Sequence, residues 1–316
     1  MRMGPYLTNK QVIFTSASYY SGIYLLEWAI SLRTLGHYQN EIFILDYGID
    51  HPIKRALESL NIRFIRRVLP NGYKEKLIVN RRLLDVIPII EEYPTDTTFV
   101  HFDADIWFQD DIQHLFQKIE HCHGCVYSTE ISRNRPLRGK IKQYPTEWTI
   151  MMKKYDFLLD QFGGHINGGF MGGNALSFLN KLYQFQKLVQ SGFISDQEWG
   201  SDQFAMNYLY NESTDQADAY KWNCVLSDAI AENKILYTKR KVKEKIAGVH
   251  YFHMNKDRMN REFHFYFLYP DLFNQCLKKT GLLKDLTNQV FLNTSAQEKS
   301  KAFLLIKNLL SNGLIQ

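Results

Sequence analysis

The sequence predicts an α/β fold with a mostly parallel central sheet and helices on both faces. Strand-like runs alternate with helical segments over the first 108 residues, and these runs are apolar along nearly their whole length. Strands buried on both faces have this composition, and alternation with helices is typical of parallel sheets. The chain has 316 residues, 45% of them hydrophobic, which is ample for a large core.

The regular elements of the first part follow from apolar periodicity and from helix-breaking residues. The first expected helix stops at Gly36, Pro52 lies in the first turn of the second, and Pro88 leaves the end of the third ambiguous. In order we expect a strand over 10–20 that runs into a polar loop, a helix over 21–36, a strand over 40–49, a helix over 50–61, a strand over 62–69, a helix over 81–93 and a strand over 97–108.

The second part is less regular and contains no internal repeat. Four glycines surround a short apolar strand within 165–178, which suggests that backbone approaches a ligand closely there. Ser201 is a residue type that caps helices, so a helix should begin at it. The other expected elements are a basic loop over 132–145, a helix over 146–162 and a strand from 247. We expect one domain over 1–270 and a helical C-terminal appendage over 271–316.

Composition excludes several classes of protein. The net charge of +5 is mild, and no nucleic-acid-binding motif is present, so we expect an anionic small molecule or membrane face rather than nucleic acid. Four cysteines suggest a reducing compartment rather than a disulfide framework, and HCHGC at 121–125 is interpreted as a turn before a strand. The N-terminus lacks the apolar core of a signal peptide, and no run reaches membrane-spanning length, so we expect a cytoplasmic protein.

The stretch FVHFDADIWF places Asp103 and Asp105 in an otherwise apolar run. Residues two apart on a strand point to the same face, and two carboxylates held that close repel unless a cation lies between them. The alternative is that the strand ends near Phe102 and the aspartates are solvated turn residues. Because ligands bind beyond the carboxyl ends of parallel strands, the position favours a metal site.

A third ligand is available near the end of the domain. His250 follows an apolar strand-like segment, His253 is the competing choice, and Lys256 is placed to meet phosphates. Two carboxylates with an imidazole suit Mn²⁺ or Mg²⁺, with open positions for phosphate oxygens. A histidine beside aromatic residues is more often a packed core residue, so each one taken singly is a weak signal.

Four segments in chain order resemble the motifs of GT-A fold glycosyltransferases, most closely the retaining glycosyltransferase family eight, which includes glycogenin and bacterial lipopolysaccharide galactosyl- and glucosyltransferases. FDAD matches the DxD motif, and INGGFMGG resembles an Asn-Ala-Gly-Val segment. SDQFAMN matches Asp-Gln-Asp-x-x-Asn, and VHYFHMNK resembles His-Tyr-x-Gly-x-x-Lys-Pro-Trp. The chain departs from these motifs at Gly168 and Phe204, and no Pro-Trp follows Lys256. The resemblance spans roughly residues 11 to 260.

The resemblance implies a Rossmann-like GT-A domain with one metal and donor site. Asp103 and Asp105 would bind Mn²⁺ or Mg²⁺, with Asp103 also near the ribose. His250 would complete the metal shell, and Lys256 would hold the diphosphate of a UDP-sugar.

The same resemblance places an arginine before the DxD strand, either Arg81 or Arg82, facing sugar or phosphate. Tyr19 or Tyr20 would stack on uracil, since a nucleobase needs an apolar platform. Core packing is an equally good explanation for these tyrosines in an aromatic-rich chain.

Three polar residues are implied to line the donor-sugar pocket: Asn167, Asp202 and Gln203. Asp202 has an alternative explanation, a charge at a helix start stabilised by the helix dipole. The pair at 196–197 has the same letters, but only Asp202-Gln203 is followed by Asn207 at the family's spacing.

These residues together imply a metal-dependent hexosyltransferase that uses a UDP-sugar, expected in cell-surface polysaccharide or lipopolysaccharide synthesis. Retention of configuration follows from the resemblance, and Asp202 is the candidate base if the enzyme inverts. A sugar nucleotidyltransferase would want a glycine-rich N-terminal loop with a lysine, which FTSASYYSG does not supply. A non-catalytic sugar-nucleotide binder of the same fold is the third alternative.

Two basic segments suggest how an acceptor arrives. The loop over 132–145 is expected to guide a phosphate- or carboxylate-bearing, glycan or lipid-linked acceptor, or else it only aids solubility. In the tail, Phe303, Ile306 and Leu310 share a helical face, which fits peripheral contact with a membrane or packing on the domain itself. The five cations of the loop are Arg133, Arg135, Arg138, Lys140 and Lys142.

Overall fold

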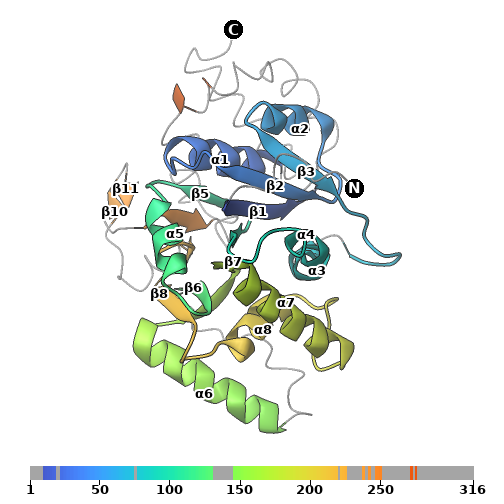
Figure 1. Ribbon diagram of the computed structural model, residues 1–316, viewed down its shortest axis with the longest axis vertical. Helices are drawn as coiled ribbons and strands as arrows, with labels where there is room; N and C mark the ends of the chain where they lie inside the picture. Colours follow the sequence, from blue (N-terminus) through green and yellow to red (C-terminus); the bar gives the residue numbers. More distant parts are fainter. Residues whose placement is uncertain are drawn as a thin grey trace.

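A seven-stranded mixed sheet forms the centre of the computed structural model (Figure 1). Its strands are β1 (Gln11–Ala17), β2 (Glu41–Asp46), β3 (Ile62–Arg66), β4 (Thr98–Phe102), β6 (Cys125–Glu130), β7 (His165–Asn174) and β8 (Gln216–Ala219). The spatial order is β3-β2-β1-β4-β7-β6-β8. Neighbours from β3 to β4 are parallel, β7 is antiparallel to both of its neighbours, and β6 and β8 are parallel.

The structure describes residues 10–18, 22–74, 77–130, 145–219, 221–225, 237–238, 241–242, 246–250, 271, 272 and 275. The loop over 132–144, the positions 253 and 256 and nearly all of the tail lie outside these residues, as do Tyr19 and Tyr20. The division at 270 and the roles given to these segments therefore stay predictions.

Helices cover both faces of the sheet, and each face has its own apolar core. One core includes side chains of α1 (Gly22–Thr34), α2 (His51–Glu58) and α5 (Gln113–Glu120). The other includes those of α3 (Ile78–Asp85), α4 (Ile87–Ile90), α6 (Pro145–Phe162), α7 (Ala175–Gln190) and α8 (Ser201–Leu209). On β1, Ile13 joins the first core while Val12 and Phe14 join the second. The predicted α/β class is confirmed.

The expected strand over 97–108 is two strands, because the chain leaves the main sheet at the two aspartates. After Phe102, the Asp103 amide still donates to Gly169 O at 2.8 Å, and Ile106 N then donates back to Asp103 O at 3.2 Å to close a turn. The chain continues as β5 (Ile106–Phe108) in a small sheet with β12 (Gly248–His250) and β9 (Cys224–Val225). The expectation that both carboxylates project from one strand face is wrong, since both lie on a turn.

Two helix boundaries also differ from expectation. The helix expected over 81–93 starts at Ile78 and is interrupted after Asp85, with Pro88 in the first turn of α4. Ser201 does not cap α8: the N-cap is Gly200, whose φ of +82° favours glycine. The Ser201 hydroxyl instead donates to Ser195 O at 2.6 Å, which ties the helix start to the preceding loop.

The four glycines of β7 serve two purposes. A Cβ at Gly172 would lie 2.6 Å from Ile119 Cδ1, and one at Gly173 would lie 3.0 Å from Cys125 Sγ, so these two permit close packing of neighbouring elements. Cβ atoms at Gly168 and Gly169 would instead meet polar side chains of the pocket described below. These two glycines line the pocket, and a close approach of their backbone to a ligand stays a prediction.

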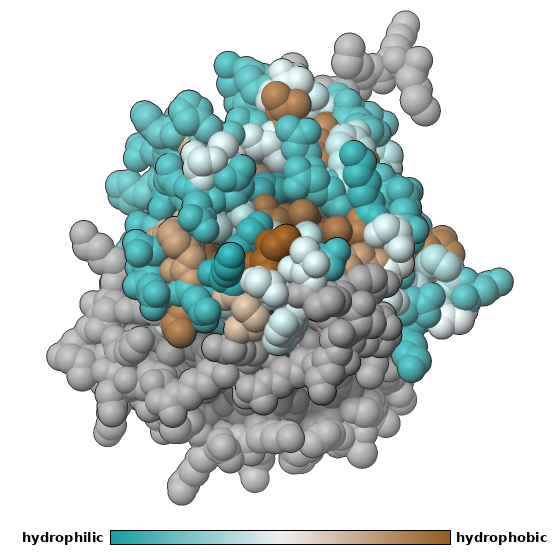
Figure 2. All heavy atoms as spheres, turned by 90° about the horizontal axis from the view of Figure 1, so that it is seen from below, coloured by the Kyte–Doolittle hydropathy of each residue, from teal (hydrophilic) through white to brown (hydrophobic). Residues whose placement is uncertain are grey.

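The surface of the described part is largely hydrophilic. Figure 2, which views the molecule from below Figure 1, shows a limited apolar area (brown) ringed by hydrophilic residues (teal). Exposed large apolar side chains in this part include Ile150 and Leu159 on α6 and Trp199. No helix in this part is long and apolar enough to cross a membrane.

Candidate functional site

A pocket of about 410 Å³ opens at the carboxyl ends of β1 and β4, a size typical of small-molecule sites. In parallel sheets this edge is where ligands bind. The pocket is lined from several segments of the chain: by Ser16, Ser18, Tyr24, Ile78, Val79, Arg82, Asp103, Ala104, Asp105, Asn167, Gly168, Gly169, Trp199, Gly200, Asp202, Gln203 and His250.

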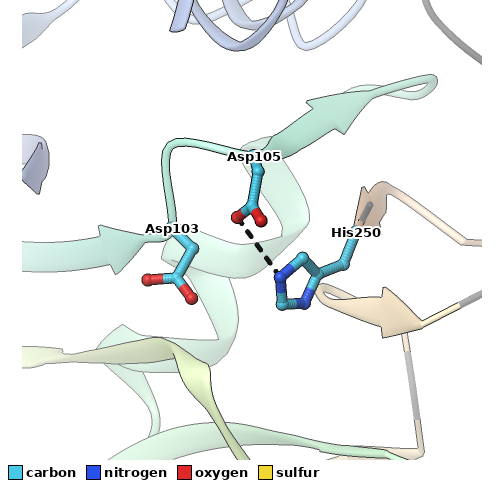
Figure 3. Close-up of side chains that lie close together, drawn as sticks. All are labelled: Asp103, Asp105 and His250. Atoms are coloured by element: carbon cyan, nitrogen blue, oxygen red, sulfur yellow. Dashed lines mark ion pairs between the residues drawn. The ribbon is translucent and has the colours of Figure 1, made fainter. Parts of the chain in front are cut away.

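Asp103, Asp105 and His250 converge at one end of this pocket (Figure 3). Each offers a ligand atom, and these atoms all lie within 4.8 Å of one another. Antiparallel pairing of β5 with β12 sets His250 opposite Ile106, directly after Asp105. Residues about 145 positions apart therefore meet through strand pairing, and His250 Nε2 lies 3.2 Å from Asp105 Oδ1.

Asp105 and His250 stabilise each other's charged form. Burial alone would raise the pKa of Asp105, but the contact with His250 outweighs it and the pKa is lowered. Burial alone would lower the pKa of His250, but Asp105 raises it above its ordinary value. The protonated imidazole of His250 thus places a positive charge beside Asp105, at a position that also suits a metal cation.

The three residues fit a divalent metal ion. Two carboxylates and one imidazole form the oxygen-rich set that Mn²⁺ or Mg²⁺ accepts. The His250 side chain is 4% exposed and that of Asp105 38%, so one side of the cluster faces the pocket, where further oxygen ligands have access.

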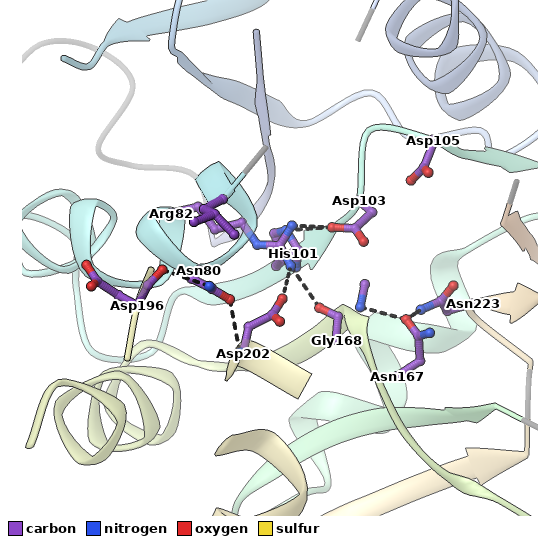
Figure 4. Close-up of polar contacts among 12 residues, drawn as sticks. Asn80, Arg82, His101, Asp103, Asp105, Asn167, Gly168, Asp196, Asp202 and Asn223 are labelled. Atoms are coloured by element: carbon purple, nitrogen blue, oxygen red, sulfur yellow. Dashed lines mark hydrogen bonds and ion pairs between the residues drawn. The ribbon is translucent and has the colours of Figure 1, made fainter. Parts of the chain in front are cut away.

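Arg82 links the metal cluster to the rest of the pocket (Figure 4). Its side chain is 2% exposed, and Nη1 makes a close ion pair with Asp103 Oδ1. Nη2 donates to Gly168 O at 2.9 Å and to Asp202 Oδ2 at 3.0 Å. The contact occupies one oxygen of Asp103 and leaves Oδ2 for a metal.

Asp202, near the start of α8, is a buried carboxyl with a perturbed pKa. Burial raises its pKa to about 6, although Arg82 acts in the opposite direction. Asp202 lies in the first turn of α8, as the helix-dipole alternative expected, and it is also 6% exposed and lines the pocket, so neither explanation excludes the other.

The loop before α8 is anchored by α3. Asn80 accepts from Asp202 N at 3.1 Å and donates to the carbonyls of Asp196 and Glu198 at 2.8 and 2.5 Å. Arg81 pairs with Asp85 at 2.8 Å, so of the two candidate arginines only Arg82 lines the pocket.

Asn167 is held at both ends of its amide. Nδ2 donates to Glu130 Oε2, while Oδ1 accepts from Gly169 N at 2.7 Å and from Asn223 Nδ2 at 2.5 Å (Figure 4). Both lone pairs of the Asn167 oxygen are thus used within the protein. Asn167 lines the pocket, but its oxygen is not available to a ligand.

His101 lies on β4 two residues before Asp103. It is fully buried against Phe14, with ring centroids 5.2 Å apart. Burial, and secondarily Arg82, holds its pKa well below the ordinary value. A neutral His101 is therefore a packed core residue.

The structure brings together most of the predicted site residues that it describes: Asn167, Asp202, Gln203, Arg82, Asp103, Asp105 and His250. Tyr19, Tyr20, His253 and Lys256 lie outside the described residues.

Sequence reasoning missed Glu130, Asn223 and the exposed Trp199. Glu130 carries a signal that was available, an acid at the last position of a buried strand, much as Asp103 directly follows β4. Asn223 and Trp199 have no comparable local signal.

Comparison with known proteins identifies the fold. No protein-family model and no curated protein matches the sequence. Among solved structures, the galactosyltransferase LgtC in complex with donor and acceptor sugar analogs matches with a TM-score of 0.55 and 15% identity, covering 92% of this chain and 99% of that one. An active-site mutant of LgtC gives 0.50 and 14%, covering 76% and 87%.

The bifunctional glycosyltransferase WbbM in its apo form matches with a TM-score of 0.52 and 12% identity, over 89% of this chain and 52% of WbbM. At such identities the likeness establishes the fold alone. The chain has the GT-A fold, as the four motifs predicted.

Proposed function

We propose that the chain is a metal-dependent glycosyltransferase that moves a hexose from a UDP-sugar to a hydroxyl acceptor. The observation that carries the proposal is the convergence of Asp103, Asp105 and His250 in one pocket at the ligand-binding edge of a GT-A sheet. These residues would hold a divalent ion, which would supply charge neutralisation for a diphosphate leaving group.

The protein's own side chains position the metal site, the diphosphate and the uracil. Asp103, Asp105 and His250 would each hold the ion through one ligand atom, with the imidazole of His250 deprotonated. Arg82 holds Asp103 and Asp202 in place, which fixes the metal cluster relative to the sugar pocket. Lys256 binds the diphosphate, and Tyr19 or Tyr20 stacks on the uracil.

Asp202 and Gln203 face the sugar and hydrogen-bond its hydroxyls. Retention is proposed on the strength of the family resemblance, with the acceptor hydroxyl attacking the face that the diphosphate leaves and a phosphate oxygen taking its proton. Inversion would instead use a base, and Asp202, with a pKa of about 6, is largely ionised at neutral pH.

The cellular setting belongs to the proposal as well. We place the enzyme in the cytoplasm, building a cell-surface polysaccharide or lipopolysaccharide. Its acceptor is a glycan or a lipid-linked, anionic molecule guided by the basic loop, with peripheral contact of the tail at the inner face of the membrane.

UDP release from a panel of UDP-sugars, with Mn²⁺ and with a chelator, tests the activity. We expect release to require metal and to rise with a suitable acceptor, and the anomer of the product, read by NMR, reports retention. Pyrophosphate formation from UTP and a sugar phosphate would indicate a nucleotidyltransferase instead.

Matched aspartate variants sharpen this test. Asp105→Asn removes a metal ligand, while Asp110→Asn makes the same change at an exposed residue of the same segment. We expect a loss of about a hundredfold or more for the first and none for the second. Sugar-nucleotide binding without any turnover would show that the protein is only a binder.

A further inference from the structure

Glu130, the last residue of β6, is a buried carboxylate that the proposed mechanism does not use. It is 6% exposed, and a buried charge is costly unless it is paired and hydrogen-bonded. β6 runs in the same direction as β4, so Glu130 lies at the edge of the sheet where the pocket opens.

Three side chains from two other elements surround this carboxylate. Gln203 Nε2 of α8 donates to Oε1 at 2.7 Å, and Asn167 Nδ2 of β7 donates to Oε2. His165 Nε2 lies 3.0 Å from Oε1. Burial alone would raise the pKa of Glu130, but these contacts outweigh it and the pKa is lowered. Glu130 is therefore ionised and can only accept hydrogen bonds.

An acceptor-only partner determines how the neighbouring amides point. A carboxylate cannot donate, so the NH₂ group of Gln203 must face Glu130 and its oxygen must face away. Gln203 also lines the pocket, and among the described residues none donates to its side-chain oxygen.

We infer that Glu130 is a positioning residue that turns the Gln203 oxygen into the pocket, so that Gln203 recognises the donor sugar by accepting a hydrogen bond from one of its hydroxyls. The inference rests on the proposed function for the identity of the ligand. Without the carboxylate the amide is free to flip and present its NH₂ group, which donates to a hydroxyl oxygen and cannot accept the hydroxyl's proton.

Equilibrium binding separates this role from catalysis. We would titrate UDP, UDP-glucose, UDP-galactose and UDP-mannose into Mn²⁺-loaded protein by calorimetry, because these hexoses differ in hydroxyl orientation at C4 and C2. For Glu130→Gln, which keeps the shape but can donate, the ratio of affinities between the best and the poorest hexose should fall by about tenfold. UDP itself carries no hexose, so its affinity should not change.

A double-mutant cycle tests whether Glu130 acts through Gln203. Gln203→Ala alone should lose the same discrimination, and Glu130→Gln added to it should cause no further loss. Glu120→Gln, on the exposed end of α5, is the matched control and should behave as wild type. Should Glu130→Gln fail to fold, Glu130→Asp, which withdraws the carboxylate by one methylene, takes its place.

The outcomes separate the two proposals. Unchanged hexose discrimination in the Glu130 variant, or losses that multiply in the double variant, overturns the positioning role whatever the turnover. Wild-type protein that discriminates hexoses but releases no UDP overturns transferase activity and leaves the positioning role standing. Wild-type protein that binds no UDP-sugar overturns both.

Discussion

Removing the charge of Arg82 should destabilise the protein by an amount that depends on pH. Arg82→Met keeps most of the side-chain volume but deletes the cation that lies 3.0 Å from the buried Asp202 carboxylate. A carboxyl whose folded-state pKa exceeds its unfolded value lowers stability as pH rises from the unfolded to the folded pKa. Arg82 limits that loss by stabilising the ionised form, so the pH-dependent part of the cost of its removal appears only where Asp202 is ionised.

The magnitude follows from the pKa of Asp202. Its rise from 3.8 to about 6 costs roughly 3 kcal/mol of unfolding free energy above pH 6, at about 1.4 kcal/mol per pKa unit. A neighbouring opposite charge typically lowers a carboxyl pKa by about one to three units, so the variant's pKa should lie near 7 to 9. The added cost at pH 8 is then about 1 to 3 kcal/mol, and near pH 5.5 only a few tenths, because Asp202 is protonated in both proteins.

Chemical denaturation in the presence of a chelator, at pH 5.5, 6.5, 7.5 and 8, measures this difference. Arg33→Met is the matched control, because Arg33 donates to the carbonyls of Tyr38, Asn40, Leu60 and Asn61 and to no carboxylate within the described part of the chain. Its cost should be the same at every pH.

Asp202→Asn should remove most of the pH dependence from the Arg82→Met effect. Asp103 also loses its Arg82 partner in this variant, but 18% of its side chain is exposed, so solvent screens its contribution to the destabilisation. A destabilisation by Arg82→Met that is equal at pH 5.5 and 8, or a control with the same pH profile, would refute the charge argument.

Two further predictions concern the metal and the pH optimum. Gly169→Ala should weaken Mn²⁺ binding by tenfold or more in calorimetry, because the new Cβ would lie 2.8 Å from Asp103 Oδ2. Gly192→Ala, at a solvent-open turn, is the control for a general effect of losing a glycine. Equal Mn²⁺ affinity in the wild type and both variants would contradict this prediction. UDP release at saturating Mn²⁺ should rise with pH through about 6, where Asp202 ionises, and an acid limb unchanged in Asp202→Asn would contradict that assignment.

Local sequence patterns were sufficient to predict most strands of the main sheet, although not β8, because strands such as β1 are buried on both faces. In β1 the apolar residues Val12, Ile13 and Phe14 are consecutive, with Ile13 in one core and Phe14 in the other, where a period-two pattern would alternate apolar with polar residues. The break after Phe102 was not predicted, because no local sequence pattern marks it. IWF is as apolar as the preceding strand, and only its pairing with β12, about 140 residues later in the chain, takes it out of the sheet.

Site residues could be predicted where the chemistry is carried by charge at a strand end, as at Asp103. The buried partners that orient such residues carry no local signal. Asn223 follows a tryptophan in a segment with little regular structure, yet its amide holds the Asn167 oxygen. Its place in the site comes from tertiary packing, which a single sequence does not record.

The DxD turn and the glycine-rich strand, which looked like separate motifs, form one structural unit. Arg82 pairs with Asp103 Oδ1, which leaves Oδ2 as the oxygen of that residue outside the ion pair. Oδ2 lies 2.8 Å from where a Cβ of Gly169 would be, and the same missing Cβ leaves room for the Asn223 and Asn167 amides. Gly169 O also accepts the Asp103 amide, which fixes the turn that carries both aspartates. The metal ligand Asp103 therefore depends on Gly169, which lies 66 positions later in the chain. The two motifs indicate a metal site when they occur together, whereas either one alone is a weak signal.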